Sequence, residues 1–143
     1  MIIGTIVNGL VIDHIPAGRG MELYHYLGLE KLNCEVALIK NATSDKYGCK
    51  DIIKINEVID LDYEALGYID PHITVNVIKD GVRIDKIHPE LPETITNVIQ
   101  CKNPRCITST EQELPQVFRL SDRQLGTYRC IYCDTKAKTP KRW

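Results

Sequence analysis

Four of the six cysteines form two short-spaced pairs in the last third of the sequence. Four residues separate Cys101 from Cys106, two separate Cys130 from Cys133, and twenty-three lie between the pairs. A pair on a tight turn directs two thiolates at one point, and Asn103–Pro104 supplies turn residues for the first pair. If the intervening residues fold back, the four sulfurs surround one ion. The spacing therefore predicts a tetrahedral Zn²⁺ site.

Two other interpretations of these cysteines stay open: a pair of disulfides, or four unrelated buried thiols. The first residues, MIIGTIV, lack the basic start and the cleavage site of a secretory signal peptide. We therefore expect a cytoplasmic protein in a reducing compartment, where disulfides are rare. Cys34 and Cys49 have no partner at a metal-binding spacing and are interpreted as ordinary thiols.

The expected zinc is structural, because four thiolates leave no ligand position for water or a substrate. Only 51 residues follow Pro92, too few to build much of a hydrophobic core alone. Binding of one structural ion per chain should therefore supply much of the folding free energy of this segment.

Charge is divided unevenly along the chain. Residues 1–92 carry nine Lys and Arg against fourteen Asp and Glu, and residues 93–143 carry nine against five. A basic zinc module suggests an alternative function as a zinc-ribbon nucleic-acid-binding module with a small ligand domain. Four thiolates leave the metal site itself at about −2, however, and no basic stripe with interleaved aromatic residues is present. We therefore expect no nucleic-acid partner, and no apolar run is long enough to span a membrane.

The first 55 residues alternate between strand and helix patterns. A β-branched segment at 3–15 is interrupted at Asn8–Gly9 and resumes at Leu10, and the run PAGRG then ends it. Met21, Tyr24 and Leu27 recur at helical spacing before Gly28. Two further strands are expected at residues 35–40 and 50–55, with a polar loop at 41–48 between them.

The next segment repeats the alternation. Asp60 or Asp62 can cap a short helix that carries Tyr63, Leu66 and Ile69. Residues 72–79 alternate as a strand, with Ile73, Val75 and Val77 on one face. Asp80–Gly81 is a strong hairpin signal, so residues 82–87 should return as the next strand.

The resulting order, βαββαββ, predicts an α+β fold of the ferredoxin-like sandwich type, an antiparallel sheet with two helices on one face. A small zinc-binding β domain follows. Pro89 and Pro92 stiffen a connector, so we place the domains at residues 1–92 and 93–143. The basic residues 135–143 lack periodicity and predict a loose tail.

No catalytic set is visible in residues 1–92, and we expect a protein that is not an enzyme. Asp13–His14 stands out, because neighbouring strand residues point to opposite faces. Taken alone, His14 is more simply a structural histidine, and Lys54 and Lys86 are more simply solvated charges.

Taken together, the order of features resembles one known family, the regulatory chains of aspartate carbamoyltransferase. The resemblance covers nearly the full length, and its cysteine spacing and DHIPAG segment are the specific parts. The matching stretches are VIDHIPAGRG at 11–20, KDIIKI at 50–55, ITVNVI at 73–78, LPETITNVIQCKNPRC at 91–106 and YRCIYC at 128–133.

This resemblance implies a non-catalytic subunit whose first domain binds allosteric nucleotides and whose zinc domain docks on a catalytic chain. It also implies CTP and ATP as effectors in the control of pyrimidine biosynthesis, and pairing with a second regulatory chain. The implied metal ligands are Cys101, Cys106, Cys130 and Cys133. The implied effector-site residues are Asp13, His14, Lys54, Asn76, Ile78 and Lys86.

The chemistry of these residues suits a nucleoside triphosphate. Lys54, Lys86 and a protonated His14 answer the negative charge of the phosphates, and Asp13 accepts hydrogen bonds from ribose hydroxyls. Asn76 bonds to polar groups of the base, and backbone groups of residues 3–6 can read the base edge. The first domain has a net negative charge, which would repel a triphosphate. A local group of cations in this domain is therefore stronger support for a triphosphate site.

Overall fold

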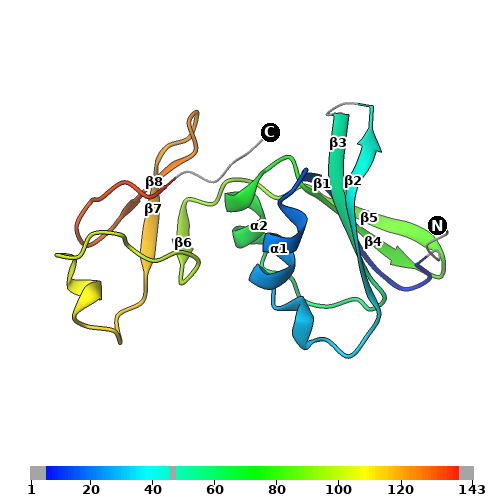
Figure 1. Ribbon diagram of the computed structural model, residues 1–143, viewed down its shortest axis with the longest axis horizontal. Helices are drawn as coiled ribbons and strands as arrows, with labels where there is room; N and C mark the ends of the chain where they lie inside the picture. The colour runs from blue at the N-terminus through cyan, green and yellow to red at the C-terminus, as the bar shows by residue number, and fades with distance from the viewer. Residues whose placement is uncertain (1–5, 46–47, 139–143) are drawn as a thin grey trace.

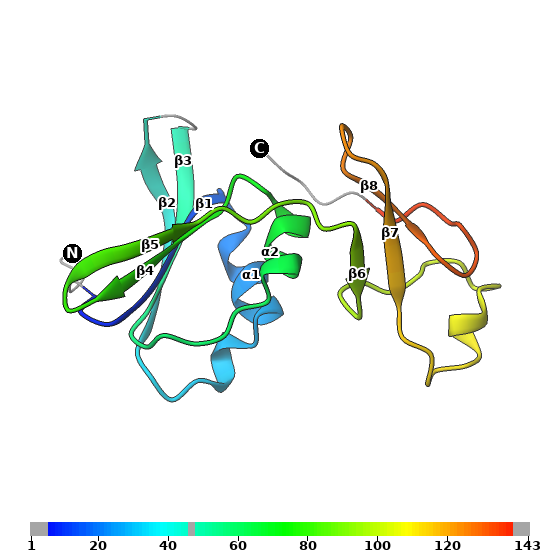
Figure 2. The same cartoon turned by 180° about the vertical axis from the view of Figure 1, so that it is seen from behind.

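The computed structural model describes residues 6–45 and 48–138, which form two lobes, each built around one sheet (Figures 1 and 2). The elements of the first lobe are β1 (Gly9–Pro16), α1 (Gly20–Tyr26), the 3₁₀ turn η1 (Leu29–Lys31), β2 (Val36–Ser44), β3 (Gly48–Ile55), α2 (Tyr63–Ile69), β4 (Thr74–Lys79) and β5 (Val82–Ile87). The elements of the second lobe are β6 (Thr94–Thr96), the 3₁₀ turn η2 (Ile107–Ser109), β7 (Val117–Asp122) and β8 (Thr127–Cys130).

The first sheet has the strand order β2-β3-β1-β4-β5, and every neighbouring pair is antiparallel. Both helices lie on one face of it, between the two sheets (Figure 1). The predicted α+β sandwich with a small second domain is therefore confirmed. Within the described ranges, no helix has the length and apolar character needed to cross a membrane.

Local signals explain where the elements begin and end. Asp62, and not Asp60, caps α2, since its carboxylate accepts a hydrogen bond from the Ala65 backbone N–H at 3.1 Å. Asp80 and Gly81 both adopt positive φ, at 52° and 77°, which is the geometry of a tight two-residue hairpin. The two helices are short and lie in the connections between strands, and the pairing of those strands determines most of the fold.

The core of the first lobe lies between the sheet and the two helices. Alternate residues of β1 are fully buried there, and they pack with buried residues of the neighbouring strands and helices. The largest of these side chains are Leu10, Ile12, Ile15, Leu23, Leu29, Ile53, Ile55, Leu66 and Ile73. The opposite face of the sheet carries no helix (Figures 1 and 2), so residues that alternate with this core are free to form a binding surface.

The predicted polar loop at 41–48 is wrong. β2 continues through Ser44 and β3 begins at Gly48, so much of this segment forms a hairpin, with Thr43 paired to Cys49. Asn41 sits at a register shift with φ of 56°, where a bulge absorbs a polar residue. Pairing with β3 therefore overrides the weak strand propensity of these residues.

The start of the predicted tail is also structured. Lys136 forms a bridge to Arg129, and the Ala137 backbone N–H donates to the carbonyl of Tyr128 at 2.8 Å. Ala137 is buried in the core of the second lobe with Phe118 and Ile95. Residues 135–138 therefore belong to the second lobe, whereas 139–143, like the predicted strand residues 3–5, lie outside the described part of the chain.

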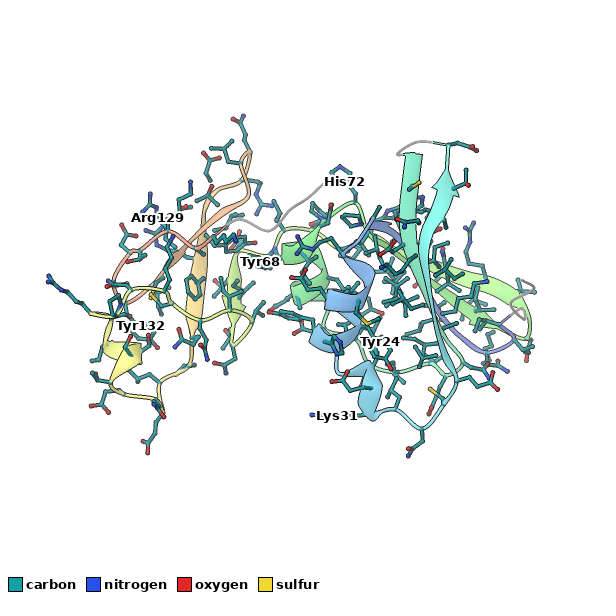
Figure 3. All side chains as sticks on the ribbon, in the orientation of Figure 1. Tyr24, Lys31, Tyr68, His72, Arg129 and Tyr132 are labelled. Carbon is teal, nitrogen blue, oxygen red and sulfur yellow. The ribbon has the colours of Figure 1, made fainter. Side chains whose placement is uncertain are left out.

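The two lobes meet through α1, α2 and the connector. Tyr68 of α2, which is labelled in Figure 3, packs edge-on against Tyr128 with 4.9 Å between the ring centroids. The Tyr26 hydroxyl donates to the Val98 carbonyl. The Tyr128 hydroxyl donates to the Pro92 carbonyl at 2.5 Å. The first two contacts link the helices of the first lobe directly to the second lobe, and the third links the second lobe to the connector.

Gly67 permits the close approach of α2 to the connector. A Cβ built there would lie 1.9 Å from the Glu90 carbonyl oxygen. We expect Gly67→Ala to destabilise the chain by about 1–3 kcal/mol, because the backbone clash outweighs the better helix propensity of alanine. Thermal unfolding of the full chain checks this, with Glu64→Ala on the exposed side of the same helix as control. Equal melting temperatures for the two variants would contradict it.

Candidate functional site

The four paired cysteines converge in the second lobe. Their sulfur atoms all lie within 4.8 Å of one another, with 3.5 Å between Cys101 and Cys133 and 3.7 Å between Cys106 and Cys130. Sulfurs around a tetrahedral zinc lie about 3.8 Å apart, from a Zn–S bond of about 2.3 Å. The first pair comes from the loop between β6 and η2, and the second from the last residue of β8 and the turn after it, so the strands of this lobe bring them together.

The surroundings of the sulfurs suit a bound dication. Burial raises the pKa of the Cys101 thiol to about 12, and burial also raises that of Cys130. The Thr135 hydroxyl lowers the pKa of Cys133 to about 6. Burying several thiolates is unfavourable unless a cation neutralises them. The donor set therefore fits one structural zinc ion.

A second group of polar residues forms a row on the open face of the first sheet. Val11 of β1 pairs with Lys54 on one side and with Asn76 on the other, and Asn76 pairs with Lys86 of β5. Directly paired residues project from the same face. The neighbour Ile12 is fully buried against the helices, so the row Lys54–Val11–Asn76–Lys86 faces away from them.

The centre of this row contains an unsatisfied polar atom. The side-chain oxygen of Asn76 is buried and has no hydrogen-bond partner among the described residues. Such atoms are uncommon in proteins and cost about 1–3 kcal/mol each. The open face therefore presents an acceptor between two lysines, an arrangement that a polar anionic ligand would complete.

Asp13 and His14 lie at one end of the row. Asp13 pairs with Thr74 of β4, and the Nδ1 atom of His14 lies 3.1 Å from the Thr74 hydroxyl. His14 has a φ of 59° at a register shift of β1. This bulge lets two consecutive residues contribute to one end of the open face, where regular alternation would separate them.

The structure adds Lys50 to this end of the face. Its ammonium group lies 2.9 and 3.1 Å from the two carboxylate oxygens of Asp13. Lys50 is four residues from Lys54 in β3, so strand alternation places both on the same face. That spacing is the sequence signal that would have identified it.

Ile78 lies at the other end of the face, paired with Gly9. The six residues singled out from the sequence therefore line one continuous part of the open face. The backbone of residues 3–5, expected to read the base edge, lies outside the described residues.

Comparison with known proteins shows which family the chain belongs to. A family model described as "Aspartate carbamoyltransferase regulatory chain, allosteric domain" matches residues 1–90, and one described as "Aspartate carbamoyltransferase regulatory chain, metal binding domain" matches residues 93–143. The chain belongs to the family of aspartate carbamoyltransferase regulatory chains.

Individual regulatory chains agree with this assignment. The regulatory chain of Clostridium botulinum strain Hall is 56% identical over 132 residues, which cover 92% of this chain and 90% of the relative. That of Clostridium acetobutylicum is 50% identical over 97% of this chain and 95% of the relative. The regulatory chain of Bifidobacterium longum is 44% identical over 96% of this chain and 99% of the relative.

Membership in the regulatory-chain family confirms two predictions from the sequence. The chain is a regulatory subunit and not a catalytic one, and it combines an allosteric domain with a metal-binding domain. The alternative of a nucleic-acid-binding zinc ribbon is not favoured by these matches.

Proposed function

We propose that this chain binds nucleoside triphosphate effectors, CTP and ATP, on the open face of its first domain. From there it transmits their effect to the catalytic chains of an aspartate carbamoyltransferase. The proposal assigns residues 1–92 to effector binding and residues 93–143 to zinc binding and docking. The observation that carries it is the buried, unpartnered oxygen of Asn76 between Lys54 and Lys86.

We assign the roles of the site residues from the chemistry of their side chains, and their places on the sheet support this assignment. Lys54, Lys86 and His14 bind the phosphates, and Lys50 adds a cation at the Asp13 end. Asp13 accepts hydrogen bonds from the ribose, and Asn76 accepts one from a donor group of the ligand. The aliphatic side chain of Ile78 packs against the base. The negative charge of the phosphates thus neutralises the positive charge of the lysines gathered on this face.

In the second domain we assign Cys101, Cys106, Cys130 and Cys133 as ligands of one zinc ion. When bound, zinc supplies a structural cross-link between the two turns. An exposed apolar residue directly follows a ligand in each turn: Ile107 is 50% exposed after Cys106, and Ile131 is 48% exposed after Cys130.

Ile107, Ile131 and the next residue in the chain, Tyr132, which is 37% exposed and is labelled in Figure 3, form the surface that docks on the catalytic chain. Exposed apolar residues of this kind mark protein contacts. Because each isoleucine adjoins a ligand, metal binding fixes the spacing of the surface. Zinc therefore controls assembly without taking part in a reaction.

A second regulatory chain pairs with the first domain along an exposed strand edge. β2 is the better edge, because it is nine residues long and rich in apolar residues at its start, whereas β5 carries Arg83 and Lys86. With Asp85 as well, half of the six residues of β5 are charged, and charged side chains on an edge strand oppose pairing.

Allosteric control requires only that the effectors bind two quaternary states with different affinity, with a typical coupling of about 1–3 kcal/mol. The route from the effector face runs through the helix layer to the second domain. The contacts of Tyr68 with Tyr128 and of Tyr26 with Val98, together with the connector at residues 89–92, provide it.

Replacement of Lys86 tests the nucleotide site. We expect Lys86→Ala to weaken binding of CTP and ATP about tenfold or more, because a charge-assisted hydrogen bond contributes about 1.5–3 kcal/mol. Assembly with the catalytic chain should be unchanged. Isothermal titration calorimetry of the zinc-loaded chain measures the affinity.

Lys79→Ala is the matched control, because Lys79 is the exposed last residue of β4 and alternation places it on the other face of the sheet from Asn76. Unchanged affinity for both nucleotides in Lys86→Ala would remove Lys86 from the site. An equal loss in Lys79→Ala would show that only net charge matters.

A further inference from the structure

Arg83 lies on the same open face as Lys86 because of a bulge in β5. Residues three apart in a regular strand project from opposite faces of the sheet. The register between β4 and β5 shifts between Val77 and Ile78, so that Asn76 pairs with Lys86 while Ile78 pairs with Arg83. Paired residues share a face. The bulge therefore adds a guanidinium group to the proposed effector surface.

Arg83 is also available to a ligand. It is exposed, and its side chain makes no hydrogen bond or ion pair with the residues the structure describes. Arg83 lies opposite Ile78 of β4. Ile78 is four residues along this strand from Thr74, so the two ends of the face are roughly 13 Å apart. An extended nucleotide can bridge such a span.

The two ends of the face differ in chemistry. His14 and Lys50 adjoin Thr74 and Asp13 at one end, which suits the anionic end of a nucleotide. At the other end Ile78 offers an apolar surface to a planar ring. A ligand oriented in this way brings the edge of its base, and not its phosphates, to Arg83.

We propose that Arg83 binds the base of the effector and favours bases that present two adjacent hydrogen-bond acceptors. A guanidinium group only donates, and its planar fork matches two neighbouring acceptors. Cytosine offers O2 with N3, and guanine offers O6 with N7. The polar edges of adenine instead place the amino donor beside a ring acceptor. The inference rests on the proposed nucleotide site and specifies its selectivity.

The test compares three nucleotides on the full zinc-loaded chain by calorimetry. Arg83→Ala should lower the affinity for CTP and GTP about tenfold and the affinity for ATP less than threefold. Arg83→Lys, which keeps the charge but loses the fork, should behave like Arg83→Ala. Lys31→Ala is the control for net charge, because Lys31 lies on η1, on the helix side of the domain (Figure 3).

Each result decides the proposal. An equal loss for all three nucleotides that Arg83→Lys restores would assign Arg83 to the phosphates and overturn base selection. Unchanged affinities in Arg83→Ala would remove Arg83 from the site while the nucleotide site itself stands. If the unaltered chain bound none of the three, the proposed function would fail, and base selection by Arg83 would fail with it.

Discussion

Removal of zinc, or the substitution Cys130→Ser, is expected to unfold the second lobe and to abolish assembly with the catalytic chain. The lobe has little else to hold it together. Its core is small, centred on Tyr128, Phe118 and Ile95, and its strands have only three, six and four residues. A structural zinc site contributes about 10–16 kcal/mol in small peptides near neutral pH. That exceeds what so small a core can supply.

Cys130 is the most informative ligand to replace. It ends β8, is buried, and packs in the core of the lobe as well as in the sulfur cluster. Serine is a much weaker zinc ligand than a thiolate and brings an unpartnered hydroxyl into the cluster. The variant should lose zinc, become sensitive to protease after residue 92, and fail to co-purify with an aspartate carbamoyltransferase catalytic chain.

Cys49→Ser is the matched control, because Cys49 is exposed in β3 of the other lobe. It should retain zinc, protease resistance and assembly. The zinc content is measured by elemental analysis and the assembly by size-exclusion chromatography. A zinc-free chain that keeps its circular dichroism and still assembles with the catalytic chain would contradict both the structural role of the metal and the docking proposal.

The sequence predicts the elements better than their lateral arrangement. Periodicity alone identifies both helices and most strands, because alternate residues such as Ile73 and Val75 are buried as expected. It cannot show that Lys54, Asn76 and Lys86 share one row, since that depends on which strands are neighbours. The family resemblance singled out these residues, and the register of the strands places them in one row.

Two kinds of residue escape sequence analysis for physical reasons. Thr43 and Ser44 look like loop residues but join β2 because β3 supplies their backbone partners. Lys50 and Asp51 look like two solvated charges in a strand. Lys50 instead pairs with Asp13 on the open face, and Asp51 is fully buried on the helix side. Only tertiary structure distinguishes a buried charge from an exposed one.

Asp51→Ala is expected to destabilise the first domain by about 3–5 kcal/mol. One carboxylate oxygen of Asp51 accepts the backbone N–H groups of Gly18 at 3.1 Å and Gly20 at 2.8 Å, and the other accepts that of Asn41 at 3.0 Å. Alanine would remove all three hydrogen bonds and leave the buried N–H of Gly20 unpaired. Each such loss costs about 1–3 kcal/mol, and access of water to the exposed residues Gly18 and Asn41 reduces the sum.

Asp51→Asn keeps the volume of the side chain and removes one of its two acceptor oxygens, so it tests the contribution of the hydrogen bonds alone. The amide keeps one acceptor oxygen, so we expect a smaller loss of about 1–3 kcal/mol. Asp60→Ala is the control, since Asp60 is exposed and does not cap α2. Urea unfolding of the zinc-loaded chain, followed by circular dichroism, measures all three variants. A loss in Asp51→Ala no greater than that in Asp60→Ala would exclude a structural role for the carboxylate.

The same substitution should also weaken nucleotide binding. Gly18 and Gly20 directly follow the end of β1, where Asp13 and His14 stand, so Asp51 holds the loop that fixes this end of the effector face. The zinc content should remain normal, because the metal lies in the other lobe. Reduced affinity for CTP with intact zinc binding would therefore show that a carboxylate on the helix side of the sheet positions residues on the opposite, ligand-binding side.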